Sequence, residues 1–495
     1  MRLLGALALS IYLLLAPQAF AALWYVDNTA SGANNGTSWA DAWTSAGAIA
    51  GLSPGDTVYI SGGAAGQSYS WTRGWTPTNG TAGNPITFAV GQDAGKNGMV
   101  TFVNDINPGG ANEWLATNTR EYITINGEVS GQRRMTIDSS FAIVAYNANF
   151  SAGDKHIRLL YLEWDGPTIY THGGYYEIAF CHGIAPLSFT DDSFISYIGE
   201  GAGATQAVGI NSIHDNYFEV PKVSATGSGF DLFKWVRNTD IYNNTLVSVI
   251  NGSYAGSQHQ DGIQAATINL RIYNNYWEGF SNAALFLATF GEDAAGMRIY
   301  NNVFNANDAS GPPIWIGSGG VSTGTISDTI IANNTAICNS SGTGRGIFFG
   351  VSAALTVGAD VNIVNNLVYR CLSNETVVTS LLGGSPTISN NVGGTTNLAF
   401  VNNSTYPTND FHLTAAATAA IDLGLFSAPA YLTSVFTTDA DGLSRPQGSA
   451  WDIGAYEFDQ GGAGPAPDPP AGGSFLSSQR PASLTRPTSP ARAVR

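Results

Sequence analysis

Charged residues are scarce in this chain, and lysine is the scarcest of them. Asp, Glu, Lys and Arg make up 11% of the 495 residues, and only four lysines occur. The formal net charge is −16. A surface this acidic lacks the basic face that binds phosphates, so we exclude nucleic acid as a partner. An acidic polymer would need a local cation or a metal ion to offset the overall repulsion.

Cysteine is also rare. Three cysteines in a chain of this length exclude a disulfide framework. Cys338 and Cys371 lie 33 positions apart (371 − 338), which is about one repeat of the pattern described below. We interpret them as buried thiols on neighbouring turns, because free cysteine behaves as a small apolar residue. One bridge between them is the alternative, and Cys181 has no partner in either case.

Long apolar runs are limited to one, at the N-terminus. Leu3–Ala16 follows Arg2 and precedes Ala19-Phe20-Ala21, a pattern typical of a signal peptide over residues 1–21. The run is short for a transmembrane helix, and no second run follows. We therefore predict an exported protein without a membrane span, either extracellular or periplasmic.

What the chain has in abundance is glycine, with 59 residues, and a repeated asparagine motif. Segments such as NTDIYNNTLV and NLRIYNNYWEGF place a short β-rich run before a pair of polar residues and a second apolar run after it. Successive repeats are 25 to 32 positions apart. The last asparagines of the repeats are Asn216, Asn244, Asn275, Asn302, Asn334, Asn366 and Asn391.

A repeat of this length without helical segments predicts a solenoid of parallel β-coils. Asparagine tolerates the left-handed backbone of a tight turn. Stacked on its equivalents, it can also hydrogen-bond along the column as an asparagine ladder. We predict one all-β domain, a parallel β-helix with its caps, over residues 22–460.

The two ends of this domain carry different patterns. TSWADAWTSAGAIAGL, residues 37–52, predicts a capping helix, because Ser38 with Asp41 resembles a capping box and Trp39 and Trp43 fall on one helical face. Residues 461–495 are rich in Pro, Gly and Ser and predict a disordered tail.

The stretch from LWYVDNTASG to VYISGG, the asparagine coils and DADGLSRPQGSAWDIGAYEF together resemble secreted right-handed parallel β-helix proteins of the pectate-lyase-like superfamily. The resemblance covers residues 23–458. It implies a right-handed β-helix and a polysaccharide substrate. Because the fold hosts lyases, hydrolases, epimerases and non-enzymatic adhesins, the reaction must be argued from the site.

Ionisable residues gather on successive coils around HQDGIQ, residues 259–264. Asp231, Lys234 and Arg237 stand on one coil, and His259 and Asp261 on the next, whereas residues 303–400 carry few charges. We predict the active site here. Further predicted substrate-binding residues are Gln264, Trp235, Tyr254 and His214, and the predicted metal ligands are Asp231 and Asp215.

These residue types suit β-elimination from a uronic-acid polymer. The reaction needs the uronate carboxylate neutralised, a base for the C5 proton and a donor for the leaving oxygen. We predict that Lys234 and His259 transfer protons and that Arg237 neutralises the carboxylate. Asp231 and Asp261 would bind a metal, with Ca²⁺ the ion considered, or orient His259.

Two further resemblances bear on the reaction. FDLFKWVRNTDIYNN resembles the lysine-bearing coil of the alginate lyase and chondroitinase B family, which implies a catalytic role for Lys234. HQDGIQ resembles the Asn-Thr-Asp-Gly strand of polygalacturonases at Asp261, where hydrolysis uses two carboxyl groups. We predict a monomeric polysaccharide lyase. The alternatives are a glycoside hydrolase, a non-catalytic carbohydrate-binding or adhesin rod, and, for HQDG itself, a polar turn whose aspartate caps local N–H groups.

Overall fold

The structure is a computed structural model that describes residues 21–459 with internal gaps. The predicted signal peptide, apart from Ala21, and the predicted tail lie outside the described residues. The gaps are 72–77, 105–112, 116–119, 139–141, 145–153, 166–168, 171–172, 186–192, 197–208, 222–230, 250–259, 266–267, 281, 289–292, 307–311, 318–323, 339–346, 350–354, 371–376, 379–382, 385, 395–397, 404–407 and 426–435.

The chain forms two compact units. The first contains Met1–Gly183 with Tyr197–Asn211, and the second contains Ile184–Ser196 with Ser212–Arg495. Each unit is built from coils whose strands pair in parallel with the equivalent strands of the next coil. The predicted all-β parallel solenoid is therefore confirmed, whereas the single domain over 22–460 stays a prediction.

The first unit has three parallel sheets and a small antiparallel pair. The first sheet contains β1 (Leu23–Val26), β2 (Thr57–Ile60), β4 (Ile86–Val90), β7 (Ile123–Asn126), β12 (Asp154–Leu160) and β15 (Gly174–Ala179). The second contains β3 (Gln67–Trp71), β5 (Val100–Asn104), β10 (Met135–Asp138), β13 (Leu162–Asp165) and β16 (His182–Ile184). The remaining strands are β6 (Glu113–Leu115), β11 (Ala142–Val144), β14 (Ile169–Tyr170), β8 (Glu128–Val129) and β9 (Gln132–Arg133).

Stacked apolar side chains form the core of this unit. Val58, Phe88, Ile125, Leu159 and Ile178 share one register position on five successive strands. Each of them is at most 1% exposed. Because every coil repeats the same inward position, the coils bury one continuous apolar column.

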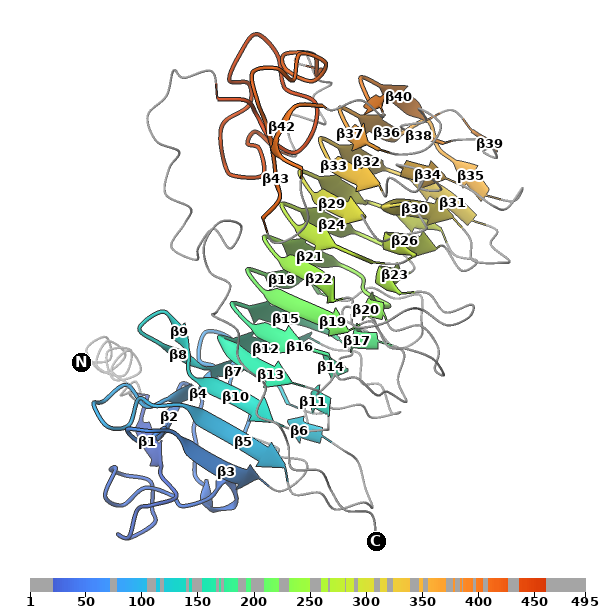
Figure 1. Cartoon of the computed structure of the whole chain (residues 1–495). Helices are drawn as coiled ribbons and strands as arrows, with labels where there is room; N and C mark the ends of the chain where they lie inside the picture. The colour runs from blue at the N-terminus through green and yellow to red at the C-terminus, as the bar shows by residue number, and fades with distance from the viewer. Residues whose placement is uncertain are drawn as a thin grey trace, which may run out of the picture. The chain divides into compact units, whose positions relative to one another are not determined.

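The second unit repeats this plan (Figure 1). Its first sheet contains β18 (Asn211–His214), β21 (Thr239–Tyr242), β24 (Leu270–Tyr273), β28 (Arg298–Tyr300), β32 (Thr329–Ala332), β36 (Val361–Val364) and β40 (Thr387–Ser389). Its second contains β19 (Tyr217–Pro221), β22 (Thr245–Val249), β25 (Tyr276–Glu278), β29 (Val303–Ala306), β33 (Thr335–Cys338), β37 (Leu367–Tyr369) and β41 (Val392–Gly394).

A third sheet of the second unit carries the predicted site residues, and we call it the site sheet. It contains β17 (Ser193–Ser196), β20 (Asp231–Lys234), β23 (Asp261–Ala265), β26 (Ala283–Ala288), β30 (Ile314–Gly317), β34 (Ile347–Phe349) and β38 (Val377–Val378). A fourth sheet contains β27 (Ala294–Ala295), β31 (Gly324–Ser327), β35 (Leu355–Val357) and β39 (Gly383–Gly384).

The predicted asparagine ladder is confirmed. The backbone N–H and the Nδ2 of Asn244 both donate to Oδ1 of Asn275, at 3.0 and 2.9 Å. Asn275 makes the same two contacts with Asn302, at 3.1 and 3.0 Å. The preceding residues Asn243 and Asn274 have φ of 53° and 54°. One asparagine of each pair therefore takes the left-handed turn, and the other links the coils.

The predicted N-terminal capping helix is wrong. The helix η1 (Ala46–Ala48), a single 3₁₀ turn, is the one helix among the described residues, none of which forms a helix of the length and apolarity needed to cross a bilayer. Ser38 and Asp41 do contact each other, with the Asp41 N–H donating to Ser38 Oγ at 3.1 Å. Trp43 instead continues the sheet, because its N–H and carbonyl bond to the backbone of Tyr25 and Asp27.

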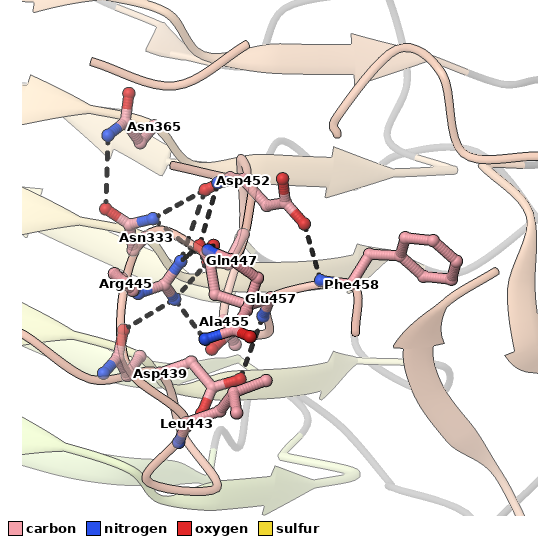
Figure 2. Close-up of polar contacts among 12 residues, drawn as sticks. Asn333, Asn365, Asp439, Leu443, Arg445, Gln447, Asp452, Ala455, Glu457 and Phe458 are labelled. Atoms are coloured by element: carbon pink, nitrogen blue, oxygen red, sulfur yellow. Dashed lines mark hydrogen bonds and ion pairs between the residues drawn. The ribbon is translucent and has the colours of Figure 1, made fainter. Parts of the chain in front are cut away.

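The C-terminal segment packs on the second sheet of the second unit. It includes the antiparallel pair β42 (Phe400–Asn402) and β43 (Asp410–Leu413), whose apolar side chains cluster with Tyr276 and Leu367. Figure 2 shows the polar part of this cap, centred on the fully buried ion pair between Arg445 and Glu457, 2.5 Å apart.

Cysteine chemistry differs from the sequence prediction. Cys338, interpreted as a thiol, is disulfide-bonded. Cys181 is a buried free thiol, so Cys371, which lies outside the described residues, is the remaining cysteine of the chain. The single bridge, the alternative to two thiols, is therefore the arrangement found.

Candidate active site

The register of the site sheet separates an inner column from an outer one. Ile195, Phe233, Ile263, Leu285 and Ile314 share a register position and have no exposed surface. Neighbouring residues of a strand point to opposite faces. The outer column one position later contains Lys234, Gln264, Phe286 and Trp315.

Lys234 ends β20 and is half-buried. Gln264 lies beside it in register on the next coil and is also half-buried. The Lys234 ammonium lies close enough to Asp261 to lower the pKa of that carboxyl group electrostatically. The structure therefore brings Lys234, Gln264 and Asp261 together.

Asp261 begins β23 and has no exposed surface. Its Oδ1 accepts hydrogen bonds from Asn282 Nδ2 at 2.8 Å and from the Ala283 N–H at 3.1 Å. Burial raises its pKa from 3.8 to about 7, although both hydrogen bonds and the Lys234 charge favour the ionised form. Asp261 therefore changes charge near neutral pH.

Asp231 does for the preceding coil what Asp261 does for the next. Its Oδ1 accepts the Asp261 N–H at 3.0 Å, and its side chain is buried. Each aspartate thus satisfies the first N–H of a neighbouring strand. A Cβ added to Gly262 would lie 2.6 Å from the Trp277 ring, so the ring requires glycine there. The Asp261-Gly262 pair has a structural role, as the polar-turn alternative supposed, but between coils rather than within one.

Arg237 and Trp235 lie in the turn that leaves β20. Trp235 is half-buried with φ of 55°, and its N–H donates to the Gln264 carbonyl at 3.2 Å. Arg237 has no exposed surface. A buried guanidinium does not face a polymer on the outer surface, so the structure does not bring Arg237 to the outer column.

His214 and Asp215 belong to a different corner of the coil. His214 ends β18, stacks on Tyr242 with ring centroids 4.7 Å apart, and places Nδ1 2.7 Å from Asp215 Oδ2. Asp215 takes the left-handed turn with φ of 55°. Neither residue is brought to the outer column of the site sheet.

The predicted metal ligands are therefore not assembled. Asp215 follows the first sheet of the unit, whereas Asp231 begins a strand of the site sheet. Among the residues that the structure describes, no group of three or more His, Cys, Asp or Glu is placed to hold a metal ion. Calcium stays a prediction, and no chemical step is derived through it. His259 and Tyr254 lie outside the described residues.

Sequence reasoning missed Phe286 and Trp315. Their ring centroids are 5.0 Å apart with an interplanar angle of 70°, and they form a small apolar cluster with Ala283. Counted back from the next ladder asparagine, the outer column lies at 10 (244 − 234), 11 (275 − 264), 16 (302 − 286) and 19 (334 − 315) positions. Only the register between strands, and no constant spacing, aligns these residues.

No protein-family model matches the chain, and no curated protein matches its sequence. Among solved structures, it is similar to pectate lyase Pel9A, with a TM-score of 0.43 and 16% identity over 89% of this chain and 97% of that one. It is similar to a PL6-family polysaccharide lyase from Pseudopedobacter saltans, with a TM-score of 0.43 and 12% identity over 75% and 95% of the two chains. A GH136 lacto-N-biosidase from Eubacterium ramulus has a TM-score of 0.38 and 10% identity over 75% and 67%. These likenesses carry over neither a reaction nor the role of any residue.

Proposed function

We propose that the chain is an exported polysaccharide lyase that cleaves a uronic-acid-containing polymer by β-elimination. The observation that carries the proposal is Lys234, one of four lysines in an acidic chain, on the outer column of a parallel β-sheet beside Gln264 and Asp261. An outward cation among amide and carboxyl groups provides both charge compensation and proton transfer to a bound uronate.

In the proposed reaction, the uronate lies over the outer column. The C5–H bond breaks, its electrons form the C4–C5 double bond, and the C4–O bond to the leaving sugar breaks. Lys234 contacts the reacting uronate, either accepting the C5 proton as an amine or offsetting the carboxylate as an ammonium. His259 takes the complementary proton role, and Asp261 positions the strand that carries Gln264.

Removing the lysine tests the proposal. Purified wild type, Lys234→Ala and Lys234→Arg are assayed on polygalacturonate, alginate and a neutral β-glucan, with and without Ca²⁺. We expect unsaturated chain ends, seen by ultraviolet absorbance, to form on one polyuronate about 10²-fold or more slowly with Lys234→Ala. The matched control is Arg271→Ala, which removes an exposed cation paired with Asp240 on another sheet and leaves the rate unchanged.

The other outcomes separate the alternatives. Reducing ends without ultraviolet absorbance mean hydrolysis, and Asp261→Asn then becomes the variant that abolishes activity. Binding without cleavage of any polymer means a non-catalytic carbohydrate-binding rod. Full activity of Lys234→Ala in a folded protein contradicts the proposed site.

A further inference from the structure

The outer column continues past Lys234 and Gln264 into two aromatic residues. Phe286 follows Gln264 in register on β26, and Trp315 follows Phe286 on β30. Adjacent strands are about 4.8 Å apart, so Trp315 lies three strand spacings, about 14 Å, from Lys234 along the column. A cation, an amide and two aromatic rings therefore occupy four consecutive coils on one face.

The two rings do not belong to the inner core. Phe286 and Trp315 form a cluster of their own with Ala283, whereas the inner column of the site sheet is made by residues such as Leu285 and Ile314. Phe286 is 6% exposed, and Trp315 is half-buried. Phe286 thus supports the indole of Trp315 from one side, while part of the indole stays accessible.

The geometry points to Trp315, supported by Phe286, as an aromatic subsite that binds a sugar ring of the polymer three coils away from Lys234. This inference rests on the proposed function, because it names how that substrate lies: along the column, across successive coils. A pyranose ring has an apolar face and a polar rim, which match an indole face and the neighbouring amide of Gln264.

The chemistry of the column favours a sugar over an apolar protein surface as the occupant. Two aromatic side chains, one of them largely buried, make a small apolar area, whereas protein partners bind larger contiguous patches. The row also begins with a cation and an amide, which is the order a polymer of uronic acids needs and an apolar helix does not.

Binding without turnover tests the subsite independently of catalysis. The full secreted chain carrying Lys234→Ala is titrated calorimetrically with di- and hexasaccharides of the polyuronate that the wild type cleaves, or, if it cleaves none, of galacturonate and of mannuronate/guluronate. Trp315→Ala added to this background is expected to weaken hexasaccharide binding about two- to tenfold. Disaccharide binding is expected to stay unchanged, since a disaccharide that binds at position 264 does not span three coils.

Two further variants keep the test decisive. Trp315→Leu retains apolar packing against Phe286 but lacks the aromatic face, so it should fold with an unchanged melting temperature and bind as weakly as Trp315→Ala. Tyr175→Ala removes an exposed aromatic ring from a different sheet and should bind as tightly as the parent.

The outcomes distinguish this inference from the proposed function. Unchanged hexasaccharide affinity of a folded Trp315→Leu overturns the subsite, whatever the enzyme does. Equal weakening for disaccharide and hexasaccharide also overturns it, because the ring would then act on the whole fold. Length-dependent weakening by a wild type that cleaves nothing supports the subsite and contradicts the lyase.

Discussion

Asn302 is a single residue on which two neighbouring coils depend. Its Oδ1 accepts from the N–H and Nδ2 of Asn275, and its Nδ2 donates to Asn334 Oδ1 and to the carbonyls of Ile272 and Tyr300. It has no exposed surface. Replacing it leaves several buried backbone groups without a partner. We expect Asn302→Ala to lower the free energy of unfolding by about 2–4 kcal/mol, measured by urea denaturation.

The control for this prediction is the neighbouring turn position. Asn274 has φ of 54°, which glycine adopts without strain, so Asn274→Gly should change the unfolding free energy by less than about 0.5 kcal/mol. Equal losses for the two variants would contradict the division of roles within each asparagine pair.

Asp261 links stability to pH. Its pKa is about 7 in the folded chain against 3.8 for an unperturbed aspartate, so the folded state binds this proton more tightly than the unfolded state. The stabilisation is fully present below about pH 4 and is lost as the pH rises through about 7. Asp452, with its pKa raised by burial to about 6, acts in the same direction.

Asp261→Asn isolates this contribution, because asparagine keeps the neutral shape without titrating. Urea midpoints of wild type should fall more steeply than those of Asp261→Asn between about pH 4 and about pH 7. Parallel curves for the two proteins would mean that Asp261 titrates equally in the folded and unfolded chains.

At the scale of elements, the C-terminal cap depends on one buried ion pair. Arg445 donates to Glu457 at 2.5 Å and to the carbonyls of Gly454 and Ala455, and Glu457 also accepts the Asp452 N–H (Figure 2). Glu457→Ala leaves the guanidinium charge buried. We expect a loss of about 3–5 kcal/mol in unfolding free energy, seen as a lower urea midpoint.

A surface pair of the same unit provides the comparison. Asp240 and Arg271 pair across β21 and β24, with half of the arginine side chain exposed. Asp240→Ala should cost less than about 1 kcal/mol, because solvent screens exposed ion pairs. A Glu457→Ala loss as small as this would show that the cap does not depend on its buried charges.

The strands could be predicted from the sequence far better than the site. The turn between the first and second sheets has a fixed length, so its asparagines recur visibly and give the coils. The site sheet is reached through segments of changing length, so Lys234 pairs with Gln264 and not with the residue at equal spacing, Ala265. Phe286 and Trp315 were missed for the same reason. The burial of Arg237 depends on packing that no local pattern carries.

At the scale of the whole molecule, composition and function are consistent. A chain with 11% charged residues and a net charge of −16 builds its two units from apolar columns and neutral amide ladders. Cations are few, so a polyanionic substrate can be held only where one of them faces outward. Lys234 on the site sheet meets that requirement beside groups able to transfer protons.

The most direct measurement of the proposed reaction is the mass of the oligosaccharides released from a polyuronate. Elimination products lack one water relative to hydrolysis products of the same length, so mass spectrometry separates the two reactions without reference to rate. We predict that wild type releases only products lacking water and that Lys234→Ala, folded to the same melting temperature, releases none. Products that retain the water, or undiminished release by Lys234→Ala, would contradict a lyase centred on this lysine.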